Sequence, residues 1–198
     1  MKKISDIAKK VDVVVWFLKK LLIVTLVIVV VALAILLGED ATYYLKMKLP
    51  ITLSFVSFRF LEECSPDSQT MKFYFWGMLI VSIVVIGFIY YELVIIQRII
   101  KPMIEQCPFD SSVVKNIRLL SWVILIGEGI LSIVDLALQI FRYYAFDFEK
   151  LFLSDKLIGV SADFDLDISF IWTFLIVYLL SYVFQYGQEL QIQSDETL

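Results

Sequence analysis

Two carboxylates interrupt a stretch of sequence that is otherwise apolar enough to cross a membrane. Ile124–Phe141 reads ILIGEGILSIVDLALQIF, with Glu128 and Asp135 in its middle and Gln139 one turn further on. A carboxylate at the centre of a membrane helix costs about 2.5–3.5 kcal/mol on translocon-insertion scales, so neither side chain is expected to face lipid. Such residues join helices by hydrogen bonds, form a proton or cation path, or act as a pH-sensitive switch.

The polar residues of this segment share one side of the expected helix. They recur at intervals close to one or two helical turns, which aligns their side chains. The members of this stripe are Ser121, Glu128, Ser132, Asp135, Gln139 and Arg142. Because the stripe is expected to face protein rather than lipid, it predicts contact with a neighbouring helix. Glu128 and Asp135 stand about 10 Å apart along the axis at 1.5 Å per residue, too far to share a proton.

The last apolar segment of the chain offers partners for these carboxylates. Its hydroxyl groups belong to Thr173, Tyr178, Ser181 and Tyr182. If the two segments run in opposite directions with their ends level, Glu128 lies at the depth of Tyr178–Tyr182. We expect Glu128 to be neutral and hydrogen-bonded there, and Asp135 to be the charged carboxylate.

We interpret this intramembrane polar network as a fastening between helices, each hydrogen bond contributing about 1 kcal/mol or less. An ion path normally shows Gly or Pro interruptions in paired spans, and Pro is absent from the apolar segments. The path and the switch remain as alternatives.

Four apolar segments of the chain are expected to form the helices that position these residues. The chain has 198 residues, 60% of them hydrophobic, and a mean hydropathy of +0.85. Its apolar residues gather into spans at about 13–37, 73–97, 119–141 and 168–187, each long enough for roughly 30 Å of hydrocarbon. The sequence predicts one all-α integral membrane domain, 1–198, with four transmembrane helices in an antiparallel bundle.

The basic residues predict the orientation. Ten Lys and Arg lie in the N-terminal arm up to Lys20 or in the loop 98–118, against seven in the loops 38–72 and 142–167. The richer side is the cytoplasmic one in membrane proteins, so both termini and the tail 188–198 are predicted to be cytoplasmic. Cys64 then lies outside and Cys107 inside, which excludes a disulfide between them.

The two outer loops contain candidate strands. Ile51–Phe60 is rich in β-branched and aromatic residues, and Asp163–Ile168 alternates acidic and apolar residues. These patterns suggest a small extracytoplasmic β-sheet built from both loops. An interfacial helix over Tyr44–Phe60 is the alternative.

The inner elements are expected to be helical. Lys3–Leu18 is a basic amphipathic segment that either lies on the inner leaflet or continues into the first span. The alternative is that it is an ordinary positive-inside anchor with no further role. The second span should continue to Lys101, where Pro102 interrupts it. A new helix should then start with Asp110 or Ser111 as its N-cap.

Catalytic chemistry is not indicated. The chain has no histidine, no glycine-rich phosphate loop and no pair of cysteines at metal-binding spacing. We therefore predict no enzymatic activity, no metal and no cofactor.

The closing sequence YVFQYGQELQIQSDETL resembles the C-terminal signature of an uncharacterised family of small bacterial four-span membrane proteins, still called a domain of unknown function. The matching residues are Phe184, Gly187, Leu190, Asp195, Thr197 and Leu198. The loop sequence CPFDSSVVKNIRLLSW is also similar to that family's pattern, through Pro108, Phe109, Asn116 and Leu119. Gln185 stands where the family usually has an arginine.

The resemblance implies a protein of the bacterial inner membrane with no established biochemical activity. Many members are encoded beside a Cro/cI-type helix-turn-helix regulator. The resemblance therefore implies that this protein is a membrane partner, anchor or sensor for such a cytosolic regulator. It would lie in the lipid bilayer and would not bind nucleic acid directly. A small transporter or a bacteriocin-immunity protein is the alternative, and a homo-oligomer is a further option.

The acidic tail predicts where a partner would dock. It has no Lys or Arg, and an anionic leaflet repels it. We expect Gln188–Leu198 and Pro108–Arg118 to form the docking site together. The residues assigned to it are Pro108, Phe109, Asn116, Arg118, Gly187, Leu190, Asp195 and Thr197.

Overall fold

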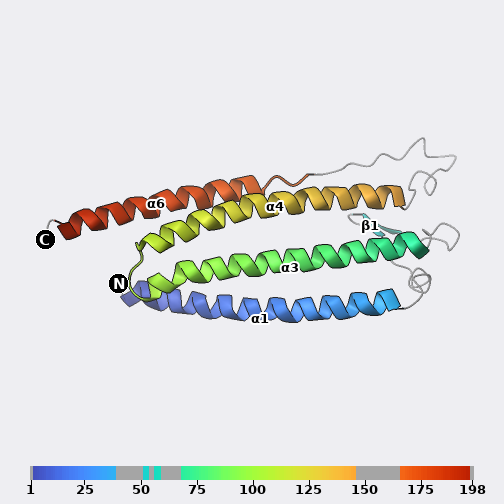
Figure 1. Ribbon diagram of the computed structural model, residues 1–198, viewed down its shortest axis with the longest axis horizontal. Coiled ribbons are helices and arrows are strands. Elements are labelled where there is room, and N and C mark those ends of the chain that lie inside the picture. The colour runs from blue at the N-terminus through green and yellow to red at the C-terminus, as the bar shows by residue number, and fades with distance from the viewer. Residues whose placement is uncertain (1, 39–50, 54–55, 59–67, 146–165, 197–198) are drawn as a thin grey trace. The chain divides into compact units, whose positions relative to one another are not determined.

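Four long helices make up most of the protein. The computed structural model describes residues 2–38, 51–53, 56–58, 68–145 and 166–196. The helices are α1 (Lys2–Gly38), α3 (Ser68–Ile104), α4 (Ser111–Ala145) and α6 (Phe170–Glu196) (Figure 1). Each contains a segment long and apolar enough to cross a membrane by length and composition, and almost none of that segment is buried inside the protein.

The helices extend beyond the predicted spans. α1 and α3 have 37 residues each, which is about 55 Å at 1.5 Å per residue and more than roughly 30 Å of hydrocarbon requires. The basic arm Lys3–Leu18 is therefore the first half of α1 and continues into the apolar segment. At the other end of the chain, α6 continues past Gly187 to Glu196.

The chain divides into two compact units. Unit 1 contains Met1–Thr25, Val84–Ile133 and Asp167–Leu198, and unit 2 contains Leu26–Ile83 and Val134–Leu166. In unit 2 the rings of Tyr74 and Phe141 stack with their centroids 6.3 Å apart. The candidate functional residues lie mainly in unit 1.

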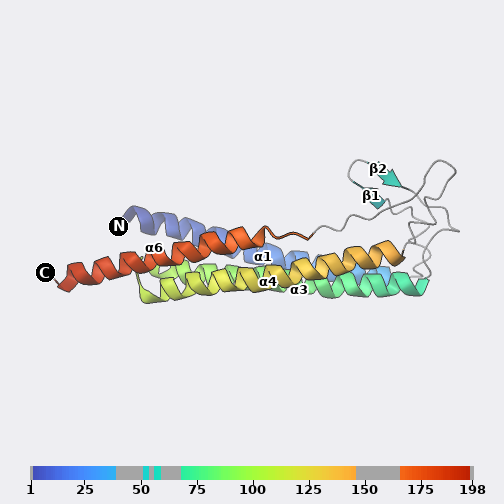
Figure 2. The ribbon, with the colours of Figure 1, turned by 90° about the horizontal axis from the view of Figure 1, so that it is seen from above.

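Unit 2 also contains two short strands. β1 (Ile51–Leu53) pairs antiparallel with β2 (Val56–Phe58), and Ile51 lies opposite Phe58 (Figure 2). In the other loop, 166–168 has no regular structure, while Asp163, Asp165 and Cys64 lie outside the described residues. The sheet shared by both loops therefore stays a prediction.

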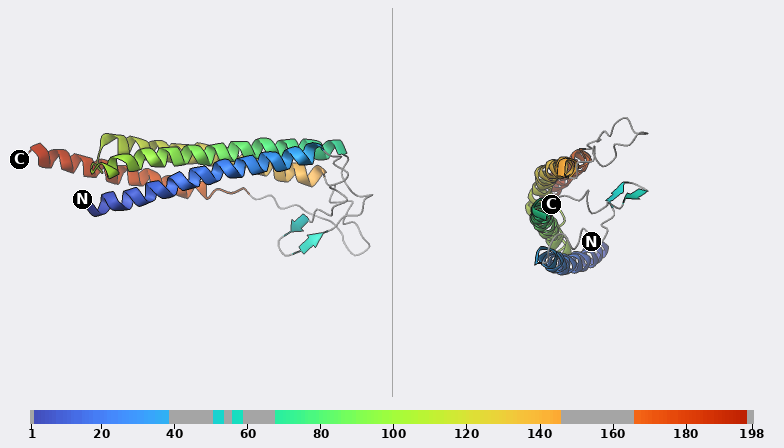
Figure 3. Two further views of the ribbon diagram at one scale, coloured as in Figure 1. Left: turned by 90° about the horizontal axis from the view of Figure 1, so that it is seen from below. Right: turned by 90° about the vertical axis from the view of Figure 1, so that its right-hand side faces the viewer.

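Contacts between α1 and α3 are polar as well as apolar in unit 1, where the two helices lie side by side (Figure 3). The Ser5 hydroxyl donates to the carbonyl of Ile104 at 2.9 Å. Lys19 donates to the Gln97 amide oxygen at 2.8 Å, and the Gln97 amide nitrogen donates to Asp12 at 3.1 Å. Ala8, Val15 and Ile100 form a buried cluster beside this chain of hydrogen bonds.

The end of α3 differs from the expectation that Pro102 interrupts the helix. Pro102 lies inside α3, which continues to Ile104. The turn then closes by two hydrogen bonds, from Cys107 N–H to the Pro102 carbonyl and from Gln106 N–H to the Met103 carbonyl. This is the Schellman arrangement, and Gln106 adopts its left-handed conformation with φ 66°. The helix therefore ends at its C-cap, one turn after the proline.

The start of α4 confirms Asp110 as the N-cap. Its carboxylate accepts the Ser112 N–H at 2.8 Å. Hydrogen bonds from the Ser112 side chain and backbone lower the pKa of Asp110. Because the folded pKa is the lower one, this cap's contribution to stability is present above the unfolded pKa and lost as the pH falls through the folded one.

Gln106→Gly should stabilise the protein. A non-glycine residue in the left-handed region costs about 1–2 kcal/mol, and glycine removes that cost. For a chain of this size we expect a rise of about 2–8 °C in the midpoint of thermal unfolding in detergent. Gln106→Ala keeps a Cβ and is the matched control, with no comparable gain expected. If the glycine variant were no more stable than the alanine variant, this description of the turn would be wrong.

Candidate functional site

Two glycines place Glu128 at a junction of three segments in unit 1. A Cβ added to Gly127 would overlap the Phe88 ring of α3, so this close approach of α3 requires glycine. On the other side, a Cβ at Gly129 would lie 3.4 Å from the Phe170 ring of α6. Glu128, between the two glycines, is half-buried.

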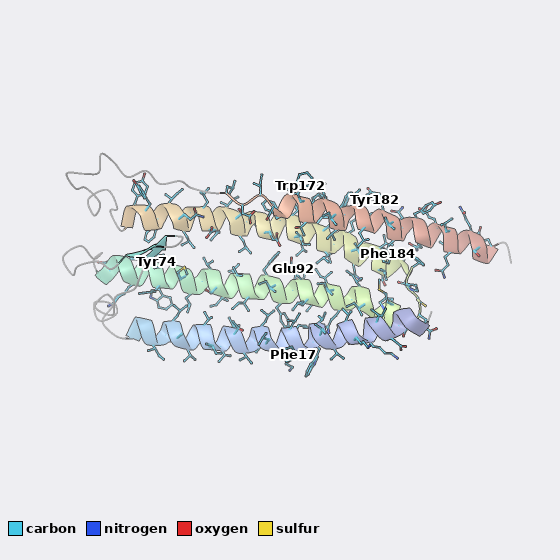
Figure 4. All side chains as sticks on the ribbon, turned by 180° about the vertical axis from the view of Figure 1, so that it is seen from behind. Phe17, Tyr74, Glu92, Trp172, Tyr182 and Phe184 are labelled. Atoms are coloured by element: carbon cyan, nitrogen blue, oxygen red, sulfur yellow. The ribbon has the colours of Figure 1, made fainter. Side chains whose placement is uncertain are left out.

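A second carboxylate approaches Glu128 from α3. Glu92 lies one turn after Phe88 and is half-buried on the side of α3 toward α4 (Figure 4). Its Oε1 is buried and has no hydrogen-bond partner in the described part of the chain. The charges of Glu92 and Glu128 would repel each other.

Glu92 was missed by the sequence analysis. It falls within the predicted span 73–97 but was not assigned to the intramembrane polar network. The apolar run Leu93–Ile96 directly after it is the signal that could have placed it inside the helix.

A third carboxylate, Asp167, precedes α6, and its negative charge repels that of Glu128. Its side chain accepts the Ser169 N–H at 2.8 Å, and hydrogen bonds from Ser169 lower the pKa of Asp167. The backbone carbonyl of Asp167 accepts the Ser132 hydroxyl at 2.6 Å, which ties the segment before α6 to α4. Among the described residues, no three metal-ligating side chains come together.

The other residues of the predicted network form hydrogen bonds within their own helices. Gln139 donates to the exposed Asp135 at 2.7 Å in α4. In α6 the hydroxyls of Tyr178 and Tyr182 lie 3.2 Å apart, and the buried Ser181 donates to the Tyr178 carbonyl at 2.6 Å. Thr173 is exposed. The structure therefore does not bring these hydroxyls to Glu128.

The register between α4 and α6 corrects the expected depth of Glu128. The glycine after Glu128 lies beside Phe170, and Trp122 contacts the rings of Phe174 and Tyr178. Glu128 is thus near the start of α6, about two turns from Tyr178–Tyr182. The assumption that the helix ends are level fails because α6 continues to Glu196 and α4 begins at Ser111.

Phe109 and Gly187, two of the residues assigned to the docking site, pack against each other just before the predicted tail Gln188–Leu198. The rings of Phe109 and Phe184 lie 6.0 Å apart, and a Cβ added to Gly187 would overlap the Phe109 ring. The Arg118 guanidinium donates to the Gln185 amide oxygen at 3.1 Å.

The remaining assigned residues are not brought into this contact. Pro108 and Asn116 are half-buried, and Leu190 is exposed. Asp195 lies in the last turn of α6, while Thr197 is outside the described residues.

No protein-family model matches the chain, and no curated protein or solved structure matches it either. The resemblance to the four-span family therefore stays a prediction.

Gly127→Ala should weaken the contact between α3 and α4. The added methyl group requires the Phe88 ring to move, and overpacking of this kind costs about 1–3 kcal/mol. Gly87→Ala is the matched control, because nothing lies within 4 Å of its added Cβ. That control should be neutral, or stabilising by up to about 1 kcal/mol through helix propensity.

Thermal unfolding in detergent measures both variants. In a Phe88→Ala background the cost of Gly127→Ala should disappear, since the obstructing ring is gone. A Gly127→Ala protein as stable as the wild type with Phe88 present would contradict this packing.

Proposed function

We propose that the protein is a bacterial inner-membrane protein that serves as a membrane partner, anchor or sensor for a cytosolic helix-turn-helix regulator. In this proposal the four helices cross the bilayer as an antiparallel bundle and both termini are cytoplasmic. The length and composition of the four apolar helices support membrane insertion. The excess of Lys and Arg on one side supports the orientation.

The contact between Phe109 and Gly187 carries the proposal. These residues belong to the two sequence signatures of the resemblance, lie far apart in the sequence, and pack against each other. Gln185 stands where the family usually has an arginine, and it receives a hydrogen bond from Arg118 of α4 instead. The two signatures thus serve one structural contact, which supports treating them as parts of one surface.

The last turns of α6 offer that surface to a partner. Tyr186, Leu190 and Ile192 are 47–63% exposed although they are apolar or aromatic. Glu189 and Glu196 are exposed on the same helix, which has no Lys or Arg. A domain that binds DNA phosphates has a basic surface, so an acidic helix end with apolar side chains is complementary to it. The proposed docking site is therefore this helix end together with the loop that contains Phe109.

The double variant Leu190→Ser/Ile192→Ser should lose the cytosolic partner while the four helices stay folded. Exposed apolar side chains of a docking surface contribute to binding but little to the fold of the free protein. Affinity purification from detergent, followed by identification of the co-purifying proteins, measures partner retention. Thermal unfolding confirms the integrity of the variant.

Gln191→Ser/Gln193→Ser is the matched control, because both glutamines are exposed on the same segment. This control should retain the partner. The proposal is wrong if the Leu190/Ile192 variant keeps the partner, or if the wild type yields no soluble DNA-binding protein.

A small transporter is the second candidate, favoured by one observation. Glu92 and Glu128 approach each other within apolar helices, and one oxygen of Glu92 is buried without a hydrogen-bond partner in the described residues. Intramembrane carboxylates of this kind often carry protons or cations. The same purification separates the two candidates, because a transporter of this class would yield no soluble regulator.

A further inference from the structure

Arg118 is a fixed cation without a matching anion. Its guanidinium donates to the neutral amide of Gln185 and lies over the ring of Tyr182, 5.6 Å from the ring centroid. No carboxylate of the described residues forms an ion pair with it, and its Nε is buried without a hydrogen-bond partner there. Because a guanidinium has five N–H donors, most of its capacity remains unused.

The position of Arg118 along α4 matches the edge of a membrane. The predicted span 119–141 begins directly after it, at Leu119. Gln97, which accepts a hydrogen bond from Lys19 of α1, is likewise the last residue of the predicted span 73–97. Basic side chains at this level of a span lie among lipid phosphates.

An aromatic surface continues from Arg118 toward the middle of the spans. On α6, Phe174, Tyr178 and Tyr182 recur every four residues, with ring centroids 5.4 and 5.3 Å apart along the row. Trp122 of α4 joins this row, 5.5 Å from Phe174. Trp122 and Tyr182 remain 45% and 49% exposed. The surface is thus cationic at one end and apolar along its length, as a phospholipid requires.

We propose that Arg118 and this aromatic row bind an anionic phospholipid. The guanidinium and the Tyr182 hydroxyl hold the phosphate, and an acyl chain lies along Trp122 and Phe174. A planar guanidinium binds phosphate through paired hydrogen bonds, and tyrosine and tryptophan favour the headgroup boundary. The row of rings favours a lipid over free phosphate, because inorganic phosphate has nothing to place there. The site depends on membrane insertion but not on the proposed regulator.

Glu189 opposes the phosphate and gives the proposal a second test. Its carboxylate, one turn after Gln185 on α6, accepts a hydrogen bond from the Gln185 amide nitrogen at 3.2 Å. The Gln185 side chain therefore separates Glu189 from the guanidinium. Removing the charge of Glu189 should tighten lipid binding, whereas a purely structural role of Arg118 predicts no effect.

The test uses the purified full chain in detergent, with phosphatidylglycerol and phosphatidylcholine of the same acyl chains as probes. Native mass spectrometry measures how much of each lipid stays bound. The wild type should retain phosphatidylglycerol about tenfold better than phosphatidylcholine. Arg118→Gln should lose that preference, and Glu189→Gln should increase it a few-fold.

Arg98→Gln is the matched control, because Arg98 is an exposed arginine near the C-terminal end of α3, on the same predicted side of the membrane as Arg118. It should keep the preference of the wild type. Inorganic phosphate in place of lipid should leave the midpoint of thermal unfolding unchanged. Equal retention of the two lipids by the wild type would overturn the proposal even if Arg118→Gln did not fold. An unchanged preference in a folded Arg118→Gln, or stabilisation by inorganic phosphate alone, would overturn it as well.

Discussion

Apolar helices in hydrocarbon gain little from packing against each other, because lipid chains are as apolar as their own side chains. Their association therefore depends on close approach at small residues and on polar contacts between helices. In unit 1 these contacts are few and well defined. Phe88 packs against Gly127, and Phe109 packs against Gly187. Each aromatic ring occupies the space that a Cβ would fill, so each glycine fixes a neighbour's position.

Polar contacts add direction to this packing. The chain of hydrogen bonds Lys19–Gln97–Asp12 joins α1 to α3, and Arg118–Gln185 joins α4 to α6. In each case a glutamine amide links a cation to a carboxylate, since Gln185 also donates to Glu189. A neutral amide between opposite charges avoids the full desolvation cost of a buried ion pair. Such contacts suit the edge of a span, where water still reaches part of each side chain.

The sequence predicts the elements better than the contacts between them. The four apolar segments and the Asp110 cap could be predicted because hydropathy and capping are local properties. The register of α6 against α4 could not, since it depends on the Phe109–Gly187 contact between distant residues. The importance of Glu92 was hidden for a related reason: nothing local shows that it faces Glu128.

The helix ends were also difficult to predict. Hydropathy locates the part of a helix that fits hydrocarbon, and polar turns beyond it give no apolar signal. α6 therefore extends through the predicted tail to Glu196, and α1 includes the whole basic arm. Two residues that the resemblance had grouped, Phe109 and Gly187, pack against each other, while the docking site itself stays a prediction. The surroundings of Arg118 could not be predicted from the sequence, because its neighbours Gln185 and Tyr182 belong to α6.

The central claim is that the four helices cross the bilayer with the Phe109–Gly187 contact on its cytoplasmic side. Cys107 is exposed and lies two residues before Phe109, which makes it a direct probe. A membrane-impermeant thiol reagent applied to intact cells should spare Cys107 in a Cys64→Ser protein and should label Cys64 in a Cys107→Ser protein. Permeabilised cells should show labelling of Cys107. Labelling of Cys107 in intact cells would contradict the orientation, and with it the placement of the proposed docking surface.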